Sequence, residues 1–195
     1  KFNLRNKKMN AKIDTSHVQL ETKRLLLRPW QMTDLKDFNE YASQPGVGEM
    51  AGWSTHQSIE ESKHILQMFI QEKKTFAIEL KSNHKVIGSI GIEEDRLAND
   101  PAFQDVYGRE IGYVLNRDYW GQGIMCEAVL RVIEYCFKDL GYDYLLCGYF
   151  LKNHQSARVN QKCGFQFLRN QDFHTRFDTI EPGHLNIMRN QKQRI

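Results

Sequence analysis

The 195-residue sequence has few cysteines and no long apolar run. Its four cysteines form no Cys-x-x-Cys pair and have no histidine nearby at metal-ligand spacing, so we expect free thiols and no metal site. No stretch approaches the about 20 apolar residues of a membrane span. No signal-peptide pattern opens the sequence either. We therefore expect a soluble, cytoplasmic protein with no membrane partner.

The sequence also has no large excess of positive or negative charge. The net charge is only +3, and much of the excess lies near the start, at Lys1, Arg5, Lys7 and Lys8. The rest of the chain is nearly balanced, which argues against direct nucleic-acid binding as the main function. Repeats, low-complexity tracts and linkers are absent, and 41% of the residues are hydrophobic. We expect a flexible N-terminal arm over 1–16 and a single domain over 17–195.

Hydrophobic periodicity predicts alternating strands and helices. The expected strands cover 24–28, 75–80, 86–94, 110–115, 144–149, 165–168 and 185–188. Helices are expected over 33–42, after Ser58 (a capping box with Glu61), after Gly123 and after Asn153. A right-handed crossover between strands 110–115 and 144–149 makes those two strands parallel, and the other strands can be antiparallel. The fold class is therefore α/β (α+β).

The strongest candidate binding site is Gly121-Gln122-Gly123, which stands between strand 110–115 and a strongly periodic helix. This order places backbone N–H groups that lack intrahelical partners at a helix N-terminus, where the dipole favours an anion. The glycines allow positive φ and close approach of a phosphate. Trp120, just before them, is expected to anchor the loop on the sheet.

A second polar pattern follows at Asn153, Ser156 and Asn160. These residues fall at i, i+3 and i+7, which is one stripe of a helix that Asn153 caps and Gly164 ends.

Together with Leu20–Pro29, these two segments resemble the GNAT superfamily of acetyl-CoA-dependent N-acetyltransferases. The resemblance is strongest to the RimJ/RimL-like branch, which acetylates the N-termini of ribosomal proteins, and it covers roughly 18–189. It implies a mixed, mostly antiparallel sheet of about seven strands with a splayed parallel central pair, flanked by about four helices. One departure is Asp118, which stands where the superfamily usually has Gln or Arg.

The resemblance also implies a set of cofactor contacts. Backbone amides of the strand would align the pantetheine and polarise the thioester, and those of the loop would bind the pyrophosphate. The residues expected to bind acetyl-CoA are Tyr113, Val114, Leu115, Gly121, Gln122, Gly123, Ile124, Met125 and Asn153.

Two residues are candidates for catalysis. Many GNAT enzymes use a tyrosine at the position of Asn160 to protonate the departing thiolate, and an amide cannot do so. Ser156 matches the serine of the RimJ/RimL-like branch and would donate a hydrogen bond instead. Glu110 is the leading base for the acceptor amine. Glu93, Glu94 and a water chain stay open as alternatives, and at most one of the Glu93/Glu94 pair can face the site.

We therefore expect an acyltransferase that moves acetyl to a primary amine by direct transfer in a ternary complex, without a covalent Cys126 intermediate. The expected acceptor is a protein N-terminal α-amine, a ribosomal protein being one candidate partner. A small amine (polyamine, amino acid or antibiotic) is the alternative, and a non-catalytic CoA-binding sensor or interaction module is the alternative of another class. The protein would be a monomer or homodimer, with segments 45–55 and 96–107 shaping the acceptor cleft.

Overall fold

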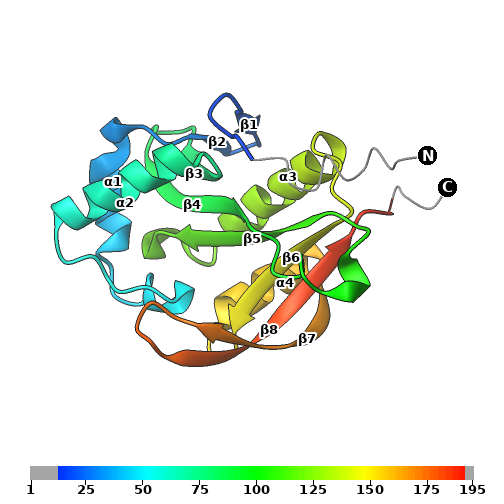
Figure 1. The fold of residues 1–195 in the computed structure, drawn as a ribbon. Helices are drawn as coiled ribbons and strands as arrows, with labels where there is room; N and C mark the ends of the chain where they lie inside the picture. Colours follow the sequence, from blue (N-terminus) through cyan, green and yellow to red (C-terminus); the bar gives the residue numbers. More distant parts are fainter. Residues whose placement is uncertain (1–12, 192–195) are drawn as a thin grey trace.

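A mixed sheet with helices on both faces forms the centre of the molecule in the computed structural model, which describes residues 13–191 (Figure 1). The strands are β1 (Leu20–Glu21), β2 (Leu25–Pro29), β3 (Thr75–Leu80), β4 (Val86–Glu93), β5 (Gly108–Leu115), β6 (Tyr144–Phe150), β7 (Gln166–His174) and β8 (Ile180–Arg189). The helices are α1 (Leu35–Ala42), α2 (Ile59–Glu72), α3 (Ile124–Lys138) and α4 (His154–Cys163). Short 3₁₀ turns are η2 (Met32–Asp34), η3 (Glu49–Ala51), η4 (Pro101–Phe103) and η5 (Arg117–Tyr119).

Within residues 13–191 the sheet has eight strands in the order β1-β2-β3-β4-β5-β6-β8-β7. Its described neighbours are antiparallel except for β5 and β6, so the predicted parallel pair is confirmed. The strand beyond the expected seven is β1. It has two residues, Leu20 and Glu21, and pairs with β2. A two-residue strand is too short to show an alternating pattern in the sequence, so it is recognised only from its pairing with a neighbouring strand.

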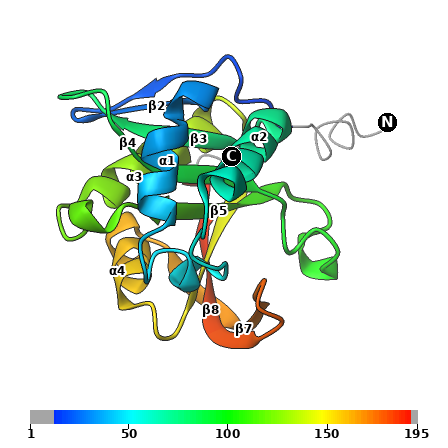
Figure 2. The ribbon, with the colours of Figure 1, turned by 90° about the vertical axis from the view of Figure 1, so that its left-hand side faces the viewer.

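The helices divide between the two faces of the sheet. Figure 2 shows α1 and α2 side by side in front of it, where Trp30, Phe38 and Leu66 form an aromatic-rich core. On the other face, α3 buries Ala128 and Val132 against the central strands. The core is therefore two apolar layers separated by the sheet, as the amphipathic stripes of the helices require.

Helix starts follow the local capping signals closely. Ser58 Oγ accepts the Glu61 N–H at 3.1 Å and caps α2, as predicted. The Glu61 carboxylate bonds to the N–H of Gln57 at 2.8 Å, not to that of Ser58, so only half of the expected capping box forms.

None of the helices described between residues 13 and 191 combines the length and the apolar character that crossing a bilayer requires.

The end of the expected N-terminal arm packs on the domain. Ile13 is buried in the core, and the Thr15 N–H donates to the carbonyl of Lys73 at 2.8 Å. The remainder of the arm, 1–12, lies outside the described residues.

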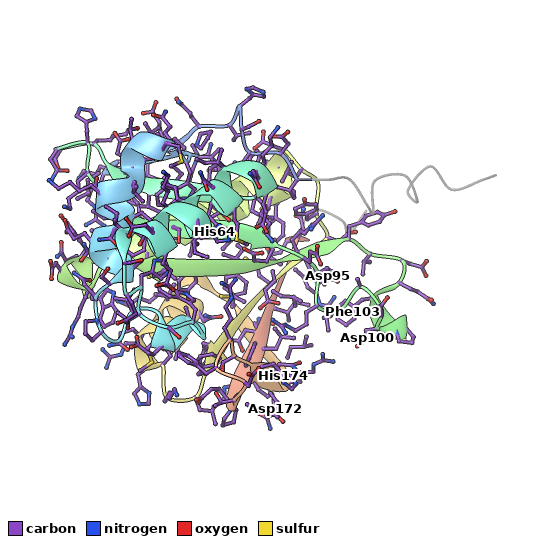
Figure 3. The ribbon with its side chains drawn as sticks, turned by 60° about the vertical axis from the view of Figure 1, so that its left-hand side comes forward. His64, Asp95, Asp100, Phe103, Asp172 and His174 are labelled. Atoms are coloured by element: carbon purple, nitrogen blue, oxygen red, sulfur yellow. The ribbon has the colours of Figure 1, made fainter. Side chains whose placement is uncertain are left out.

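The long β4–β5 connection forms a satellite core away from the glycine loop. Figure 3 shows it through Asp95, Asp100 and Phe103, at the opposite end of β5 from α1. Tyr144 Oη donates to Asp95 at 2.6 Å, and Phe103 stacks edge-on against the Tyr144 ring. These contacts hold the connection at the N-terminal end of β5, whereas Gly121 and Gly123 follow its C-terminal end.

The parallel pairing of β5 and β6 is short. It ends at Glu110 opposite Leu146, and beyond that point β5 continues to pair with β4 and β6 with β8. Alternate backbone N–H and C=O groups of the rest of β5 therefore face a gap with no strand partner. This gap positions the candidate site.

Candidate functional site

The loop between β5 and α3 is held in place from several directions. The Asn116 side chain accepts from the Asp118 N–H at 3.0 Å and from Gln44 at 3.1 Å, and it is fully buried. Trp120 Nε1 donates to the Leu115 carbonyl at 2.9 Å, and its ring packs on both cores. Trp120 thus anchors the loop, as predicted from the sequence.

The two glycines of the loop adopt conformations that other residues rarely take. Gly121 has φ +76° and Gly123, the N-cap of α3, has φ +73°. A Cβ at Gly121 would meet no protein atom within 4 Å. No side chain among residues 13–191 caps α3, so its first N–H groups are available to an anion beside this open space.

A cation that is distant in the sequence, just before β2, lies beside this loop. The Arg24 guanidinium donates to the Gln122 carbonyl at 3.0 Å and pairs with Glu127 at 2.7 Å. Its Nη2 lies 3.9 Å from the position of a Cβ at Gly123. Arg24 therefore ties the loop to the segment before β2, and its charge there is paired with that of Glu127. Sequence reasoning missed this role, because nothing local links Arg24 to Gly123.

A cavity of about 230 Å³, here called the loop cavity, runs from this loop to α4. Eight of the nine expected cofactor residues line it, and Gln122 is not among the lining residues. The eight are Tyr113, Val114, Leu115, Gly121, Gly123, Ile124, Met125 and Asn153. Arg158 and Lys162, both exposed on α4, also line it, so its rim carries two cations.

The first turn of α4 forms the opposite wall. Asn153 Oδ1 accepts the Ser156 N–H at 3.0 Å, which confirms the predicted N-cap, and Asn153 Nδ2 donates to the Met50 carbonyl at 3.1 Å. Ser156 is nearly buried and its hydroxyl lies 2.8 Å from Tyr113 Oη. The side chain of Asn160 donates to the same Tyr113 oxygen at 3.2 Å. The predicted stripe on α4 thus meets a tyrosine that reaches across from β5.

A second cavity of about 420 Å³, here called the aromatic cavity, adjoins the first. The two share Ala51, Tyr113 and Val114 as lining residues. Aromatic side chains dominate its walls, and its charged residues are Glu61, Glu93 and Arg176. The aromatic lining residues are Phe38, Tyr41, Trp53, His56, Phe69 and Tyr113. Residues of segment 45–55 line both cavities, and no residue of segment 96–107, which was expected to shape the acceptor cleft with it, lines either of them.

The three candidate carboxylates make different contacts, although Glu93 and Glu110 are paired across β4 and β5. Glu93 lines the aromatic cavity, where its side chain lies over Gly91 and Gly112, and it pairs with Lys74 at 2.9 Å. Glu94 is exposed, in agreement with the expectation that only one of the two faces the site. Glu110 lines neither cavity. It lies where β5 and β6 part and binds the Arg96 guanidinium through contacts of 2.8 and 3.2 Å. Burial raises the pKa of Glu110, and Arg96 opposes that rise.

A histidine with a defined tautomer also lines the aromatic cavity. Ser62 Oγ donates to Asn39 at 2.9 Å, so it accepts from His56 Nδ1–H at 2.8 Å. Burial lowers the pKa of His56, which keeps the ring neutral with Nε2 as a hydrogen-bond acceptor. No motif marks His56, since its partners come from α1 and α2.

Three of the four cysteines, Cys136, Cys147 and Cys163, are buried. All four are free thiols, and Cys126 lines the loop cavity. Burial raises the pKa of Cys147 and of Cys163 to about 12, so both stay protonated near neutral pH. Within residues 13–191 no group of three or more His, Cys, Asp or Glu side chains is arranged to hold a metal ion.

Comparisons with known proteins agree with this geometry. The family model described as "Acetyltransferase (GNAT) domain" matches residues 24–166. An "Uncharacterized N-acetyltransferase YoaA" of Bacillus subtilis is 31% identical over 153 residues, covering 75% of this chain and 82% of that protein.

Two solved structures share the fold at low sequence identity. The ribosomal-protein-S5-alanine acetyltransferase of Vibrio fischeri has a TM-score of 0.68 and 22% identity, over 90% of this chain and 98% of that one. The microcin C7 self-immunity acetyltransferase MccE, in complex with acetyl-CoA and AMP, has a TM-score of 0.69 and 14% identity, over 93% of this chain and 98% of that one. With the glycine loop, the parted parallel strands and the family match together, this chain belongs to the GNAT family and is an N-acetyltransferase.

Proposed function

We propose that this protein transfers the acetyl group of acetyl-CoA to a primary amine, with a protein N-terminal α-amine as the acceptor. The observation that carries the proposal is the meeting of two unlike cavities at Ala51, Tyr113 and Val114. One has unpaired backbone donors and a basic rim, which suit a phosphate-rich cofactor. The other has aromatic walls and a carboxylate, which suit an amine-bearing acceptor.

Different residues of the loop cavity would bind different parts of acetyl-CoA. The N–H groups at the start of α3, with Arg158 and Lys162 on the rim, would hold the phosphates. The backbone of β5 beyond Glu110, which has no strand partner on the β6 side, would bind the pantetheine and the thioester oxygen. Ser156, at the start of α4, would donate a hydrogen bond to the sulfur as the carbon–sulfur bond breaks.

The acceptor amine must lose a proton to attack. We propose Glu93 as the carboxylate that receives the ammonium group, because it lines the aromatic cavity and lies over Gly112, next to Tyr113. Glu110 stays the alternative that the sequence ranks first. Its raised pKa suits a base, but it lines neither cavity, and its carboxylate is bound to Arg96 just as that of Glu93 is bound to Lys74.

Two features support a protein N-terminus as the acceptor. The motifs resemble the RimJ/RimL-like branch, and one of the structural neighbours is named a ribosomal-protein acetyltransferase. The test is thiol release from acetyl-CoA with a panel of ribosomal-protein N-terminal peptides, polyamines, amino acids and aminoglycosides. Faster turnover of peptides supports the proposal, faster turnover of a small amine overturns the acceptor, and binding of acetyl-CoA without thiol release for any amine favours a non-catalytic role.

The pH dependence of the rate separates the two carboxylates. An α-amine with a pKa near 8 is about one-tenth neutral at pH 7, so a base can raise the rate there by roughly tenfold and little at pH 9.5. We therefore expect Glu93→Gln to lower kcat/KM about tenfold at pH 7 and less than about twofold at pH 9.5. Glu110→Gln should give a loss that does not depend on pH. The reverse pattern in the two variants would assign the base to Glu110.

A further inference from the structure

A chain of buried polar side chains leads from the sheet to Ser156. Asn186 on β8 donates through Nδ2 to Asn160 Oδ1 at 3.0 Å. Asn160 donates through Nδ2 to Tyr113 Oη at 3.2 Å, and Tyr113 Oη lies 2.8 Å from Ser156 Oγ. Asn160 and Asn186 are 1% and 6% exposed, so water does not compete for these bonds.

The hydrogen bonds of this chain run in one direction. The bond from Asn186 fixes which end of the Asn160 amide carries the oxygen, so the NH₂ group faces Tyr113. The phenol oxygen accepts there and has one proton to donate. Its nearest acceptor is Ser156 Oγ, because the Ser156 carbonyl is farther, at 3.4 Å, and already accepts from Asn160 at 3.1 Å. The Cys147 thiol also contacts Tyr113 and Asn160, but sulfur is a weak acceptor. Ser156 Oγ therefore accepts from Tyr113, and its own proton is free for a ligand.

The surroundings keep the chain in this state. Burial raises the pKa of Tyr113 well above its ordinary value, so the phenol stays protonated wherever the protein is folded near neutral pH. Ser156 lies in the first turn of α4, whose dipole favours negative charge at its N-terminus. Both Tyr113 and Ser156 line the loop cavity, where the acetyl donor is expected.

We propose that Tyr113 is a positioning residue that holds the Ser156 hydroxyl with its proton directed at the sulfur of coenzyme A. The inference rests on the proposed function and deepens it. When the amine nitrogen bonds to the acetyl carbon, the carbon–sulfur bond breaks and its electron pair goes to sulfur. The Ser156 hydroxyl stabilises that thiolate, and the hydrogen bond from Tyr113 makes the hydroxyl a stronger donor. Tyr113 keeps its proton, and the proton lost by the amine nitrogen reaches the thiolate through solvent.

The test uses the thiol of bound coenzyme A, which needs no knowledge of the acceptor. The absorbance of the thiolate is titrated in the complex, and the same complex with desulfo-coenzyme A is subtracted to remove the protein's own groups. We expect the wild-type protein to lower the pKa of the bound thiol. Tyr113→Phe should lose part of this effect, Ser156→Ala should lose more, and the double variant should match Ser156→Ala. Where an active amine is known, Tyr113→Phe should lower kcat about fivefold in the wild-type background and less than twofold in Ser156→Ala.

Tyr149→Phe is the matched control. It also deletes one phenol hydroxyl, which lies 3.1 Å from His184 Nδ1, and Tyr149 lines neither cavity. The thiol pKa and kcat should equal those of the wild type. Equal effects of Tyr113→Phe with and without Ser156, or no effect on the thiol pKa, overturn the inference. Failure to bind coenzyme A at all instead contradicts the proposed function, so the two failures are distinguishable. If Tyr113→Phe does not fold, Asn160→Asp gives a second test, because its carboxylate takes the Tyr113 proton away from Ser156. Its negative charge alone raises the thiol pKa in any background, so the inference requires a larger rise with Ser156 present than in Ser156→Ala, and equal rises overturn it.

Discussion

Replacing Gly123 with valine will abolish measurable binding of acetyl-CoA, a loss of at least about a hundredfold in affinity. The residue has φ +73° and caps α3, and the space beside it holds no protein atom closer than Arg24 Nη2 at 3.9 Å. A branched side chain there would occupy the space in which a phosphate must approach the N–H groups of the helix. Calorimetric titration with acetyl-CoA measures the effect.

Gly141 offers a control for backbone strain. It has φ +69°, and a Cβ there would meet no atom within 4 Å, so Gly141→Val carries a similar conformational cost of about 1–2 kcal/mol. It follows α3 and lines neither cavity. We expect its thermal midpoint to fall as in Gly123→Val while its affinity for acetyl-CoA stays that of the wild type. Full binding by Gly123→Val would remove this loop from the cofactor site.

Removing the hydroxyl of Ser156 will lower kcat about ten- to a hundredfold and leave the affinity for acetyl-CoA nearly unchanged. The hydroxyl would contact sulfur that becomes negative only as the acetyl group leaves, so its hydrogen bond strengthens in the transition state. One hydrogen bond to a developing charge contributes roughly 1.5–3 kcal/mol, which corresponds to that range of rates. Steady-state kinetics with the best amine, beside calorimetry with acetyl-CoA, separate the two quantities.

Two other outcomes for Ser156→Ala would contradict a role of this serine in catalysis. A rise in the dissociation constant of acetyl-CoA with unchanged kcat would mean that Ser156 contributes to ground-state binding alone. An unchanged kcat and an unchanged affinity would leave the serine as a first-turn residue of α4, where its N–H bond to Asn153 already supports the helix start.

The sequence predicts those parts of the site that depend on local signals. The order of strand, Gly121, Gly123 and helix, and the Asn153 cap of α4, are confirmed. Capping, positive φ at glycine and the period of an amphipathic helix all involve residues within a few positions of one another. The parallel pairing of β5 and β6 was also predicted, although it spans more of the chain, because a strand–helix–strand order within one sheet favours a right-handed parallel crossover.

Sequence reasoning was weaker wherever several candidates shared one chemistry. Glu93, Glu94 and Glu110 are all glutamates, so residue type does not distinguish them. Only the register of the sheet places the Glu93 side chain over Gly91 and Gly112, which face each other on β4 and β5. Neither of those glycines has a side chain to cover the floor of the aromatic cavity. Such an opening arises from two strands together and has no signature in either strand.

By itself, then, the sequence predicted the fold class, because short-range periodicity and capping encode its elements. The family followed from the resemblance of its motifs, which also marked the two segments that we propose bind the cofactor and act in catalysis. Only the tertiary structure decided which side chains meet there. Arg24 contacts a loop about a hundred residues away in the sequence, and the phenol of Tyr113 on β5 contacts Ser156 on α4, beside Asn160. Contacts of this kind depend on the relative placement of β2, β5, α3 and α4, which packing across the sheet sets and no local pattern records.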